Sequence, residues 1–368
     1  MRSFGWLTAW LLFGLSPSST TAFSSLRVKE LYAGWDDQAP YRPDVSETSV
    51  HVISWSPRAF VIRNLLSDME CTHIAEQAQV RMRRSTVVSN EDGSSVLSDY
   101  RTSYGTFIRR GSTPVVQAVE DRVAWLTRAP VINQEAMQVL RYGRGQFYKP
   151  HTDSLSDDSP RMATVLLYLS DPELGGETAF PQATEWADPA MPEKFGPFSE
   201  CVKSNVAFKP RRGDALLFWS VQPDGKTLDP FSEHEGCPVL QGVKWTGTVW
   251  VHTSPHRMEE FNATTGRFNP PGPGETDDPG FCVDAHASCE EWASKGECKR
   301  NASYMTGHGN QVGQCRRACG VCEPCAEGDR DCYNRNRESQ GYLVYDPQEL
   351  LEGGERRRAQ EAADEAEL

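Results

Sequence analysis

The stretch Gln138-Val-Leu-Arg-Tyr-Gly-Arg-Gly-Gln-Phe-Tyr-Lys-Pro-His-Thr-Asp153 decides how the rest of the chain is interpreted. It ends in an imidazole and a carboxylate two residues apart, His151 and Asp153. Successive side chains of a β-strand point to opposite faces of the sheet, so residues i and i+2 point the same way. A strand that carries His151 and Asp153 would therefore direct two ligands towards one divalent metal ion.

A third candidate ligand lies far downstream, at His234 in Phe231-Ser-Glu-His-Glu-Gly-Cys-Pro-Val239. Two histidines and one carboxylate that leave coordination positions open are typical of non-haem iron(II) oxygenases. The competing interpretation of His151 and Asp153 is an ordinary strand pair, because a lone His-x-Asp is more often that than a metal site. The choice depends on whether the fold brings His234 to the other two residues.

Lys244 follows His234 by ten residues and lies between Val243 and Trp245 in a predicted core strand. Lysine is almost never fully buried unless it is paired, and a buried ammonium group needs a partner. If no protein carboxylate supplies that partner, the carboxylate of a bound ligand is the next candidate. The alternative is a surface lysine on an edge strand.

The composition describes a soluble globular protein with room for one full core and a smaller second unit. The chain has 368 residues, of which 38% are hydrophobic and 24% are charged. Its formal net charge of −13 argues against a nucleic-acid partner, which would require a basic face. The charge suits basic or neutral partners, and nothing in the sequence sets the oligomeric state.

The N-terminus has the form of a secretory signal over residues 1–22. Arg2 precedes an apolar run from Trp6 to Leu15, and small residues follow the run. The run is short for a membrane span, which needs about 20 residues. The alternatives are an uncleaved signal anchor, which would tether the protein to a membrane, and plastid targeting.

The cysteines also indicate the secretory pathway. Six of the eleven cysteines lie between Cys282 and Cys322, a density typical of an oxidising compartment. Glycosylation sequons at Asn262 and Asn301 agree with this. The predicted location is the lumen of the endoplasmic reticulum or the Golgi.

Helix and strand signals predict a mainly β fold with flanking helices. Residues 23–57 lack periodicity and are predicted to form an irregular lead-in. Ser67 and Glu70 have capping-box spacing and start one helix, and Thr113-Pro114 starts another. Short strands are predicted over Ala59–Ile62, Met137–Tyr142, Met162–Leu169, Asp214–Trp219 and Trp245–Val251. Two helices followed by a run of short strands favour a double-stranded β-helix (jelly-roll) core.

Composition divides the rest of the chain into further regions. The β domain is predicted over residues 58–253, and a proline- and glycine-rich linker follows over 254–280. A cysteine-rich domain occupies 281–322. A charged tail with no assigned function covers 323–368, and its end, from Glu349 to Leu368, is predicted to be a solvated helix.

Ordered sequence blocks across residues 58–253 resemble the catalytic domains of prolyl 4-hydroxylases, and the plant and algal branch of that family is closest in pattern. Each block alone would be a weak signal, but their shared order and spacing make coincidence a poor explanation. The blocks are Tyr142-x3-Gln146-x-Tyr148-x2-His151-x-Asp153, Arg161-x-Ala-Thr-Val-Leu-Leu-Tyr-Leu169, Gly175-Gly-Glu-Thr178, Gly213-Asp-Ala-Leu-Leu-Phe-Trp219 and His234-x-Gly-Cys-Pro-Val-x2-Gly-x-Lys-Trp245.

This resemblance implies an iron(II) enzyme that uses 2-oxoglutarate as co-substrate and ascorbate as a further cofactor. His151, Asp153 and His234 match the iron ligands of the family. Lys244 matches the residue that pairs with the distal carboxylate of 2-oxoglutarate. Three further positions match the pocket of the co-substrate: Tyr142, Thr178 and Trp250.

The resemblance also implies a set of positions that face the peptide substrate. The Ser85–Tyr100 segment matches a mobile loop that folds over the bound peptide. The matching substrate-facing residues are Arg101, Gln138, Tyr148, Arg161 and His252.

The pattern Cys282-x6-Cys289-x8-Cys298-x16-Cys315-x3-Cys319-x2-Cys322 resembles a ShK-toxin-like domain. Six cysteines alone allow 15 pairings. A zinc site is the competing interpretation, and the expected role is accessory binding. Cys201 and Cys237 are either a bridge, as in the matching family, or two free thiols, and Cys325 is expected to pair locally with Cys332. The bridges that the resemblance implies are Cys282–Cys322, Cys289–Cys315 and Cys298–Cys319.

Three hypotheses follow. The first is a secretory-pathway peptidyl-proline 4-hydroxylase that acts on a proline-rich peptide or protein. The second keeps the oxygenase but changes its substrate. The third is a secreted binding protein whose ShK-like unit is functional and whose barrel is vestigial.

Overall fold

The computed structural model describes most of the chain after the predicted signal. The described residues are 48–88, 95–97, 99–154, 159–269, 278–308 and 311–344. The predicted signal segment, most of the lead-in, the middle of the predicted mobile loop and the end of the tail lie outside them. Among the described residues, no helix combines the length and the apolar character that crossing a bilayer requires.

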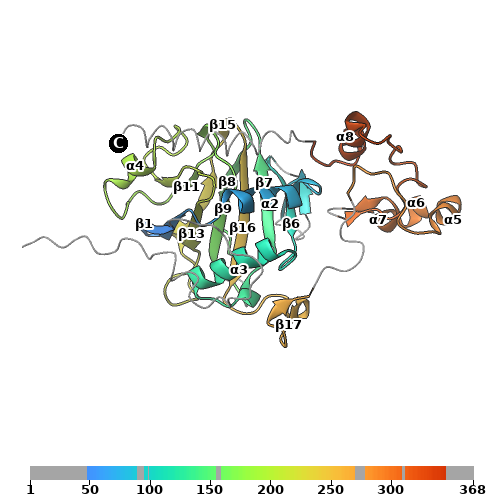
Figure 1. Ribbon diagram of the computed structural model, residues 1–368. Helices are drawn as coiled ribbons and strands as arrows, with labels where there is room; N and C mark the ends of the chain where they lie inside the picture. The colour runs from blue at the N-terminus through green and yellow to red at the C-terminus, as the bar shows by residue number, and fades with distance from the viewer. Residues whose placement is uncertain are drawn as a thin grey trace, which may run out of the picture.

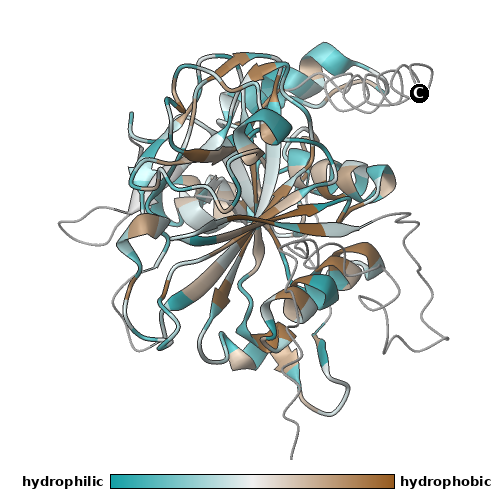
Figure 2. Ribbon diagram, turned by 90° about the vertical axis from the view of Figure 1, so that its left-hand side faces the viewer, coloured by the Kyte–Doolittle hydropathy of each residue, from teal (hydrophilic) through white to brown (hydrophobic). Residues whose placement is uncertain are grey.

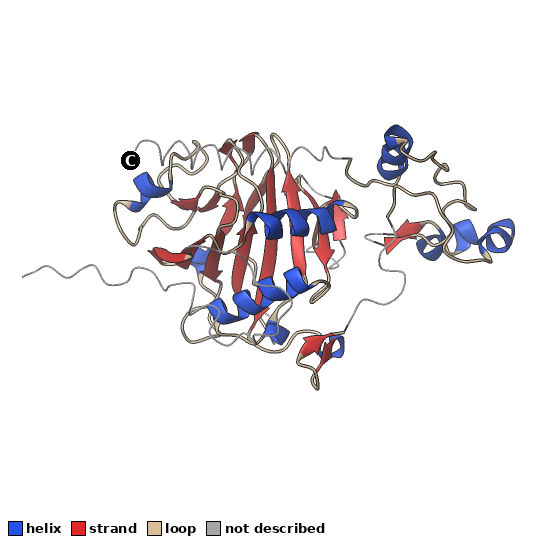
Figure 3. Cartoon of the chain, in the orientation of Figure 1, coloured by secondary structure: helices blue, strands red, loops and turns tan. Residues whose placement is uncertain are grey.

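Two antiparallel sheets form the main body of the protein (Figures 1 and 3). The larger sheet has the order β1 (Ser49–Trp55), β2 (Arg58–Arg63), β13 (Ala215–Trp219), β9 (Arg161–Tyr168), β16 (Lys244–His252), β7 (Met137–Tyr142), β6 (Tyr104–Ile108) and β3 (Arg83–Arg84). The smaller sheet has the order β12 (Val206–Phe208), β11 (Thr178–Phe180), β14 (His234–Gly236) and β8 (Tyr148–His151). This arrangement confirms the predicted double-stranded β-helix.

Aromatic side chains fill the space between the two sheets. Tyr168 and Phe218 of the larger sheet pack with Phe180 and Phe208 of the smaller one, and all four are buried. Figure 2 shows the hydrophobic colour concentrated on the strands in the middle of this body. The core therefore holds the two sheets together.

Two helices cover the outer face of the larger sheet (Figure 1). The first, α2 (Asp68–Gln79), has the predicted capping box between Ser67 and Glu70. The second, α3 (Pro114–Thr127), begins at Thr113, whose hydroxyl accepts from a backbone N–H of the first turn. Their apolar faces, which include Ile74 and Val119, pack on the sheet in a second buried cluster.

Several short elements complete the chain. They are β4 (Thr86–Val88), β5 (Ser95–Leu97), η1 (Val131–Asn133), β10 (Leu174–Gly175), α4 (Met191–Phe195), η2 (Pro230–Ser232), β15 (Val239–Gln241), η3 (Met258–Glu260), β17 (Phe261–Asn262), β18 (Arg267–Phe268), α5 (Cys289–Ser294), α6 (Glu297–Arg300), α7 (Ala302–Met305), β19 (Gly307–His308), β20 (Gln311–Val312) and α8 (Arg330–Ser339).

The irregular lead-in predicted over residues 23–57 is wrong for its last part, because β1 pairs with β2 along its length. A register shift lies between Val52 and Ser54. Such a bulge breaks the alternation of apolar and polar residues from which a strand is recognised. The alternation of apolar and polar residues therefore does not identify β1 in the sequence.

The linker predicted over residues 254–280 also begins too early. Residues 254–269 fold back onto the body, where the buried guanidinium of Arg110 donates to the carbonyls of Gln134 and His256. The same guanidinium pairs with Glu260 at 3.0 Å and lies 4.3 Å from the ring centroid of Phe268. Only residues 270–277, which lie outside the described residues, are left for a linker.

The charged tail predicted over residues 323–368 is folded in its described part, and the solvated helix predicted from Glu349 to Leu368 lies outside the described residues. Its helix α8 carries Arg337, which is buried and donates to the carbonyls of Gln79 and Val80 at the end of α2. The N–H of Leu343 donates to the carbonyl of Met82 at 2.7 Å. The tail thus fastens the C-terminal unit to the β domain.

The C-terminal unit is built on disulfides, with short helices and no large core. Its bridges join the cysteines that the family resemblance implies, and Cys325 pairs with Cys332 inside the tail. A fifth disulfide, between Cys201 and Cys237, lies in the β domain. The bridges of the unit itself are Cys282–Cys322, Cys289–Cys315 and Cys298–Cys319.

Candidate metal and co-substrate site

His151, Asp153 and His234 converge on one point between neighbouring strands of the smaller sheet. His151 ends β8 and lies directly opposite His234, the first residue of β14. Asp153 follows two residues after His151, and its carboxylate oxygens lie 3.7 Å from His151 Nε2 and 3.6 Å from His234 Nε2. The three ligand atoms all lie within 4.8 Å of one another. One ion can therefore contact all three side chains.

Hydrogen bonds hold both imidazoles in the tautomer that a metal ligand requires. His151 Nδ1 lies 2.9 Å from the carbonyl oxygen of Lys149, and His234 Nδ1 lies 3.0 Å from that of Ser232. A carbonyl oxygen only accepts hydrogen bonds, so each Nδ1 carries the hydrogen. The Nε2 lone pairs then face the shared point, as in most protein metal sites.

The protonation states also suit a divalent cation. Burial, together with the neighbouring imidazole of His234, lowers the pKa of His151 to about 3. Burial opposes the ionisation of Asp153, but His234, His151 and a hydrogen bond from Thr164 outweigh it, so the pKa of Asp153 is lowered. A neutral imidazole and an ionised carboxylate are the forms that bind metal. This donor set fits iron(II).

Thr164 is a contributor that the sequence did not single out. Its hydroxyl, on β9 of the larger sheet, donates to Asp153 Oδ2 at 2.6 Å. This bond occupies one oxygen and fixes the orientation of the carboxylate. The residue lies within one of the motif blocks, but nothing in the sequence shows that it reaches across to Asp153.

Two other clusters of potential ligands occur among the described residues, and neither is free to bind a metal. In the first, Glu135 is already held by Arg161 at 2.5 Å and by His252 at 2.8 Å, with His256 beside them. In the second, which contains Glu235, both sulfurs belong to the Cys201–Cys237 disulfide.

Lys244 lies beside the metal site and is buried, with 4% of its surface exposed. Its Nζ lies 3.5 Å from Thr178 Oγ1, which in turn accepts a hydrogen bond from Tyr168 at 3.0 Å. A Cβ added to Gly236, two residues after His234 on β14, would lie 4.0 Å from the same Nζ. The ammonium group therefore lies along the strand that carries one of the metal ligands.

Within the described residues, no carboxylate forms an ion pair with Lys244. Burial lowers the pKa of Lys244 to about 7, and the more distant charge of Glu177 opposes the shift only in part. Nζ lies 5.6 Å from the ring centroid of Tyr142 and 5.8 Å from that of Tyr168. A buried cation that has no carboxylate partner among the described residues favours a ligand that brings its own negative charge.

The predicted substrate-facing residues fall into two groups. In the first group, Tyr148 stacks on His151 with ring centroids 3.6 Å apart. The guanidinium of Arg101 lies 4.7 Å from the Tyr148 ring centroid and donates to Gln138 Oε1 at 2.9 Å. These three residues form one connected surface next to a metal ligand.

In the second group, Arg161 and His252 share the carboxylate of Glu135, which sequence reasoning missed. Burial would raise the pKa of Glu135, but hydrogen bonds from His252 and Arg161 lower it to about 2. Arg161 also donates to the Asp153 carbonyl at 3.2 Å and lies 3.9 Å from the ring centroid of Trp250. The predicted co-substrate residue Trp250 thus stacks under this arginine.

The Ser85–Tyr100 segment, predicted to be a mobile loop, is described only in part. Strands β4 and β5 pair as a hairpin. At its end, Tyr100 donates a hydrogen bond to the carbonyl of Pro150, and its ring lies 6.4 Å from that of Tyr148. The end of this segment at Tyr100 therefore lies beside the candidate metal site.

Comparisons with known proteins agree with this geometry. Residues 137–252 match the 2OG-Fe(II) oxygenase superfamily, and residues 281–322 match the ShK domain-like family. The chain is 42% identical over 284 residues to prolyl 4-hydroxylase 2 of Arabidopsis thaliana, which covers 76% of this chain and 89% of the relative. It is 46% identical over 212 residues to prolyl 4-hydroxylase 5 of the same plant, covering 56% and 72%.

Among solved structures, a viral collagen prolyl hydroxylase from Paramecium Bursaria Chlorella virus-1, in complex with 2OG, covers 53% of this chain and 96% of its own, at 25% identity and a TM-score of 0.39. The extent of the match to the Arabidopsis enzyme decides the classification. The chain belongs to the prolyl 4-hydroxylase family of 2-oxoglutarate- and iron(II)-dependent oxygenases, with a ShK-like domain after the oxygenase domain.

Proposed function

We propose that this dioxygenase hydroxylates C4 of proline in proline-rich peptides or proteins, with iron(II), dioxygen and 2-oxoglutarate, and with ascorbate as a further cofactor. One observation carries the proposal: a complete His151, Asp153 and His234 set lies beside a buried Lys244 that has no carboxylate partner among the described residues. The prolyl 4-hydroxylase relatives supply the substrate class.

The site residues have distinct tasks. His151, Asp153 and His234 would hold iron(II) and leave coordination positions open for 2-oxoglutarate and dioxygen. When bound, these groups supply the oxidising chemistry that gives hydroxyproline, succinate and carbon dioxide. Lys244 would pair with the distal carboxylate of 2-oxoglutarate, while Thr178 accepts from the ammonium. The buried surroundings exclude water from the reaction.

The surface formed by Tyr148, Arg101 and Gln138 would receive the peptide. A proline-rich chain offers carbonyl acceptors and apolar rings, but few N–H donors. An aromatic face flanked by a guanidinium group suits such a chain. Arg161, held by Glu135 and bonded to the Asp153 carbonyl, would border the site on its other side.

The proposal includes the secretory pathway, with the endoplasmic reticulum lumen or the Golgi as the location. Five disulfides support an oxidising compartment. The signal segment over residues 1–22 would direct entry, either cleaved or kept as a membrane anchor. The sequon asparagine Asn262 is exposed and would accept a glycan.

The test is succinate release with a panel of proline-rich peptides and of small molecules. We expect the wild-type protein to release succinate only with the peptides and to add one oxygen atom to proline. His151→Ala should give neither succinate nor hydroxylated proline. Succinate release driven by a non-peptide compound instead would favour an oxygenase of another substrate. Absence of iron(II) and 2-oxoglutarate binding would favour a binding protein with a vestigial barrel.

A further inference from the structure

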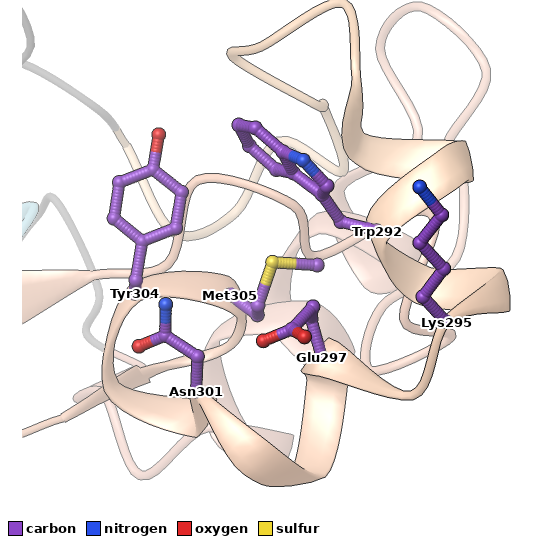
Figure 4. A pocket seen from close by; sticks show the side chains of 6 residues that line it. All are labelled: Trp292, Lys295, Glu297, Asn301, Tyr304 and Met305. Carbon is purple, nitrogen blue, oxygen red and sulfur yellow. The ribbon is translucent and has the colours of Figure 1, made fainter.

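A cavity of about 360 Å³ opens on the ShK-like unit, on elements separate from those of the metal site (Figure 4). It is formed by the short helices α5, α6 and α7. Its lining combines two aromatic rings, one thioether and three polar side chains: Trp292, Lys295, Glu297, Asn301, Tyr304 and Met305.

The aromatic walls of the cavity are held in place before any ligand binds. Trp292 stacks on His286 with ring centroids 4.4 Å apart and 24° between the planes. Tyr304 meets Trp292 edge to face at 5.9 Å and 70°. Met305 lies between them and is 1% exposed, so it forms the floor (Figure 4). Disulfides from Cys289 and Cys298 fix the helices. Such preorganisation lowers the entropic cost of binding.

The charges of the lining are already paired, whereas several donors are free. Lys295 bonds Glu291 at 2.5 Å, and Glu297 bonds Arg300 at 2.9 Å. Within the described part of the chain, the Trp292 indole N–H, the Asn301 amide and the Tyr304 hydroxyl have no hydrogen-bond partner in the protein. The cavity therefore favours an uncharged ligand that presents carbonyl acceptors and apolar surface.

A proline-rich chain has this chemistry. In the polyproline II conformation it has no internal hydrogen bonds, its carbonyls are free to accept, and its rings are apolar. Aromatic-lined grooves are the usual receptors for such chains. We propose that the Trp292–Tyr304 cavity is a second binding site for the proline-rich substrate, remote from the metal; this rests on the proposed function.

The tail connects the ShK-like unit, which carries this second site, to the β domain. Tyr333 of α8 donates to Asp278 Oδ2 at 2.6 Å, and Asn336 donates to the Gly280 carbonyl at 3.1 Å, at the start of the ShK-like unit. The same helix is bound through Arg337 to the end of α2. Two linked sites that one long chain reaches at the same time bind it more tightly than either does alone.

The kinetic test compares two substrates. Poly(L-proline) of about 20 residues extends about 60 Å as polyproline II, whereas a peptide of about five residues occupies only one site. Trp292→Ala is expected to raise the KM for the long substrate about tenfold and to leave the kcat for that substrate unchanged. The KM and kcat for the short peptide should both stay unchanged. Val283→Ala, on an exposed residue of the same unit outside the cavity, is the matched control.

A binding test separates this proposal from the proposed function. Fluorescently labelled poly(L-proline) is titrated with the full chain, produced in a host that adds no N-glycans, without iron or 2-oxoglutarate. Tyr304→Ala, at a site 41% exposed and so safe for folding, should weaken binding as Trp292→Ala does. If binding depends on these residues, but the wild-type protein supplied separately with iron(II) and 2-oxoglutarate hydroxylates no proline-rich peptide, the cavity is upheld and the proposed function is refuted. Unchanged binding and KM in both variants, or binding of an oligosaccharide in place of the peptide, would overturn the second site.

Discussion

Replacement of Lys244 by methionine is expected to stabilise the ligand-free protein while it destroys co-substrate binding. The ammonium is 4% exposed, and burial lowers its pKa from 10.5 to about 7. A shift of this size corresponds to about 5 kcal/mol of disfavoured charge at most. Replacing buried ionic groups by apolar residues of similar volume typically stabilises proteins by about 1–4 kcal/mol. We expect a gain within that range for Lys244→Met at pH 6.

The pH dependence of this gain has a defined sign. The folded-state pKa of Lys244 lies below its unfolded value, so the charged form is a cost that is fully present below pH 7. That cost disappears as the pH rises from about 7 towards 10.5. Wild-type stability should therefore contain a rising component over this window, of at most about 1.4 kcal/mol per pH unit. Lys244→Met should lack this rise in stability with pH. Urea unfolding of both proteins at pH 6 and pH 9 measures the difference.

Lys244→Met should weaken the binding of 2-oxoglutarate, although it stabilises the ligand-free protein. Removal of one partner from a buried ion pair costs about 3–5 kcal/mol, so the Kd for 2-oxoglutarate should rise at least about 100-fold. Isothermal titration calorimetry measures it, with exposed Lys226→Met as the matched control. Unchanged co-substrate affinity in Lys244→Met, or a variant less stable than wild type at pH 6, would refute the reasoning.

Three further changes test the surroundings of the site. Thr164→Val removes the hydrogen bond to Asp153 and should weaken iron(II) binding about 10–100-fold, measured by metal titration; unchanged affinity would show that the bond does not orient the carboxylate. Glu135→Gln leaves Arg161 without its carboxylate. The pKa of Glu135 is lowered to about 2, so its ionised form contributes about 3 kcal/mol to the free energy of unfolding. This contribution is present above pH 4.5 and is lost as the pH falls towards 2. Urea unfolding should therefore find the variant less stable than wild type at pH 7, and the two should become equally stable in acid. Arg337→Ala removes the bonds from α8 to the end of α2 and should speed hydrogen exchange there, whereas exchange at the wild-type rate would mean that the tail is not an anchor.

Residue types and the family resemblance predicted the three candidate metal ligands, which the structure brings together. Strand alternation does not account for their convergence, because β8 ends at His151 and Asp153 lies just beyond the strand, while His234 lies opposite His151 in the neighbouring strand. Thr164 and Glu135 were not predictable in the same way. Their roles depend on the register of strands distant in sequence, which no local pattern encodes.

The tail escaped prediction for a different physical reason. Helix α8 packs through Asn336 and Arg337, whose polar groups bond backbone carbonyls, and only Cys332 joins them among its buried residues. A search for apolar periodicity finds helices that bury a hydrophobic face. It cannot find a helix that is held by hydrogen bonds, so α8 was not predicted.

The most direct test is mass spectrometry of a proline-rich peptide incubated with the protein, iron(II), 2-oxoglutarate and ascorbate. The wild-type protein should add one oxygen atom to proline, with succinate formed in equal amount. His151→Ala, with an unchanged circular dichroism spectrum, should add none. Proline hydroxylation that persists in this folded variant would contradict the assignment of His151, Asp153 and His234 as the iron ligands.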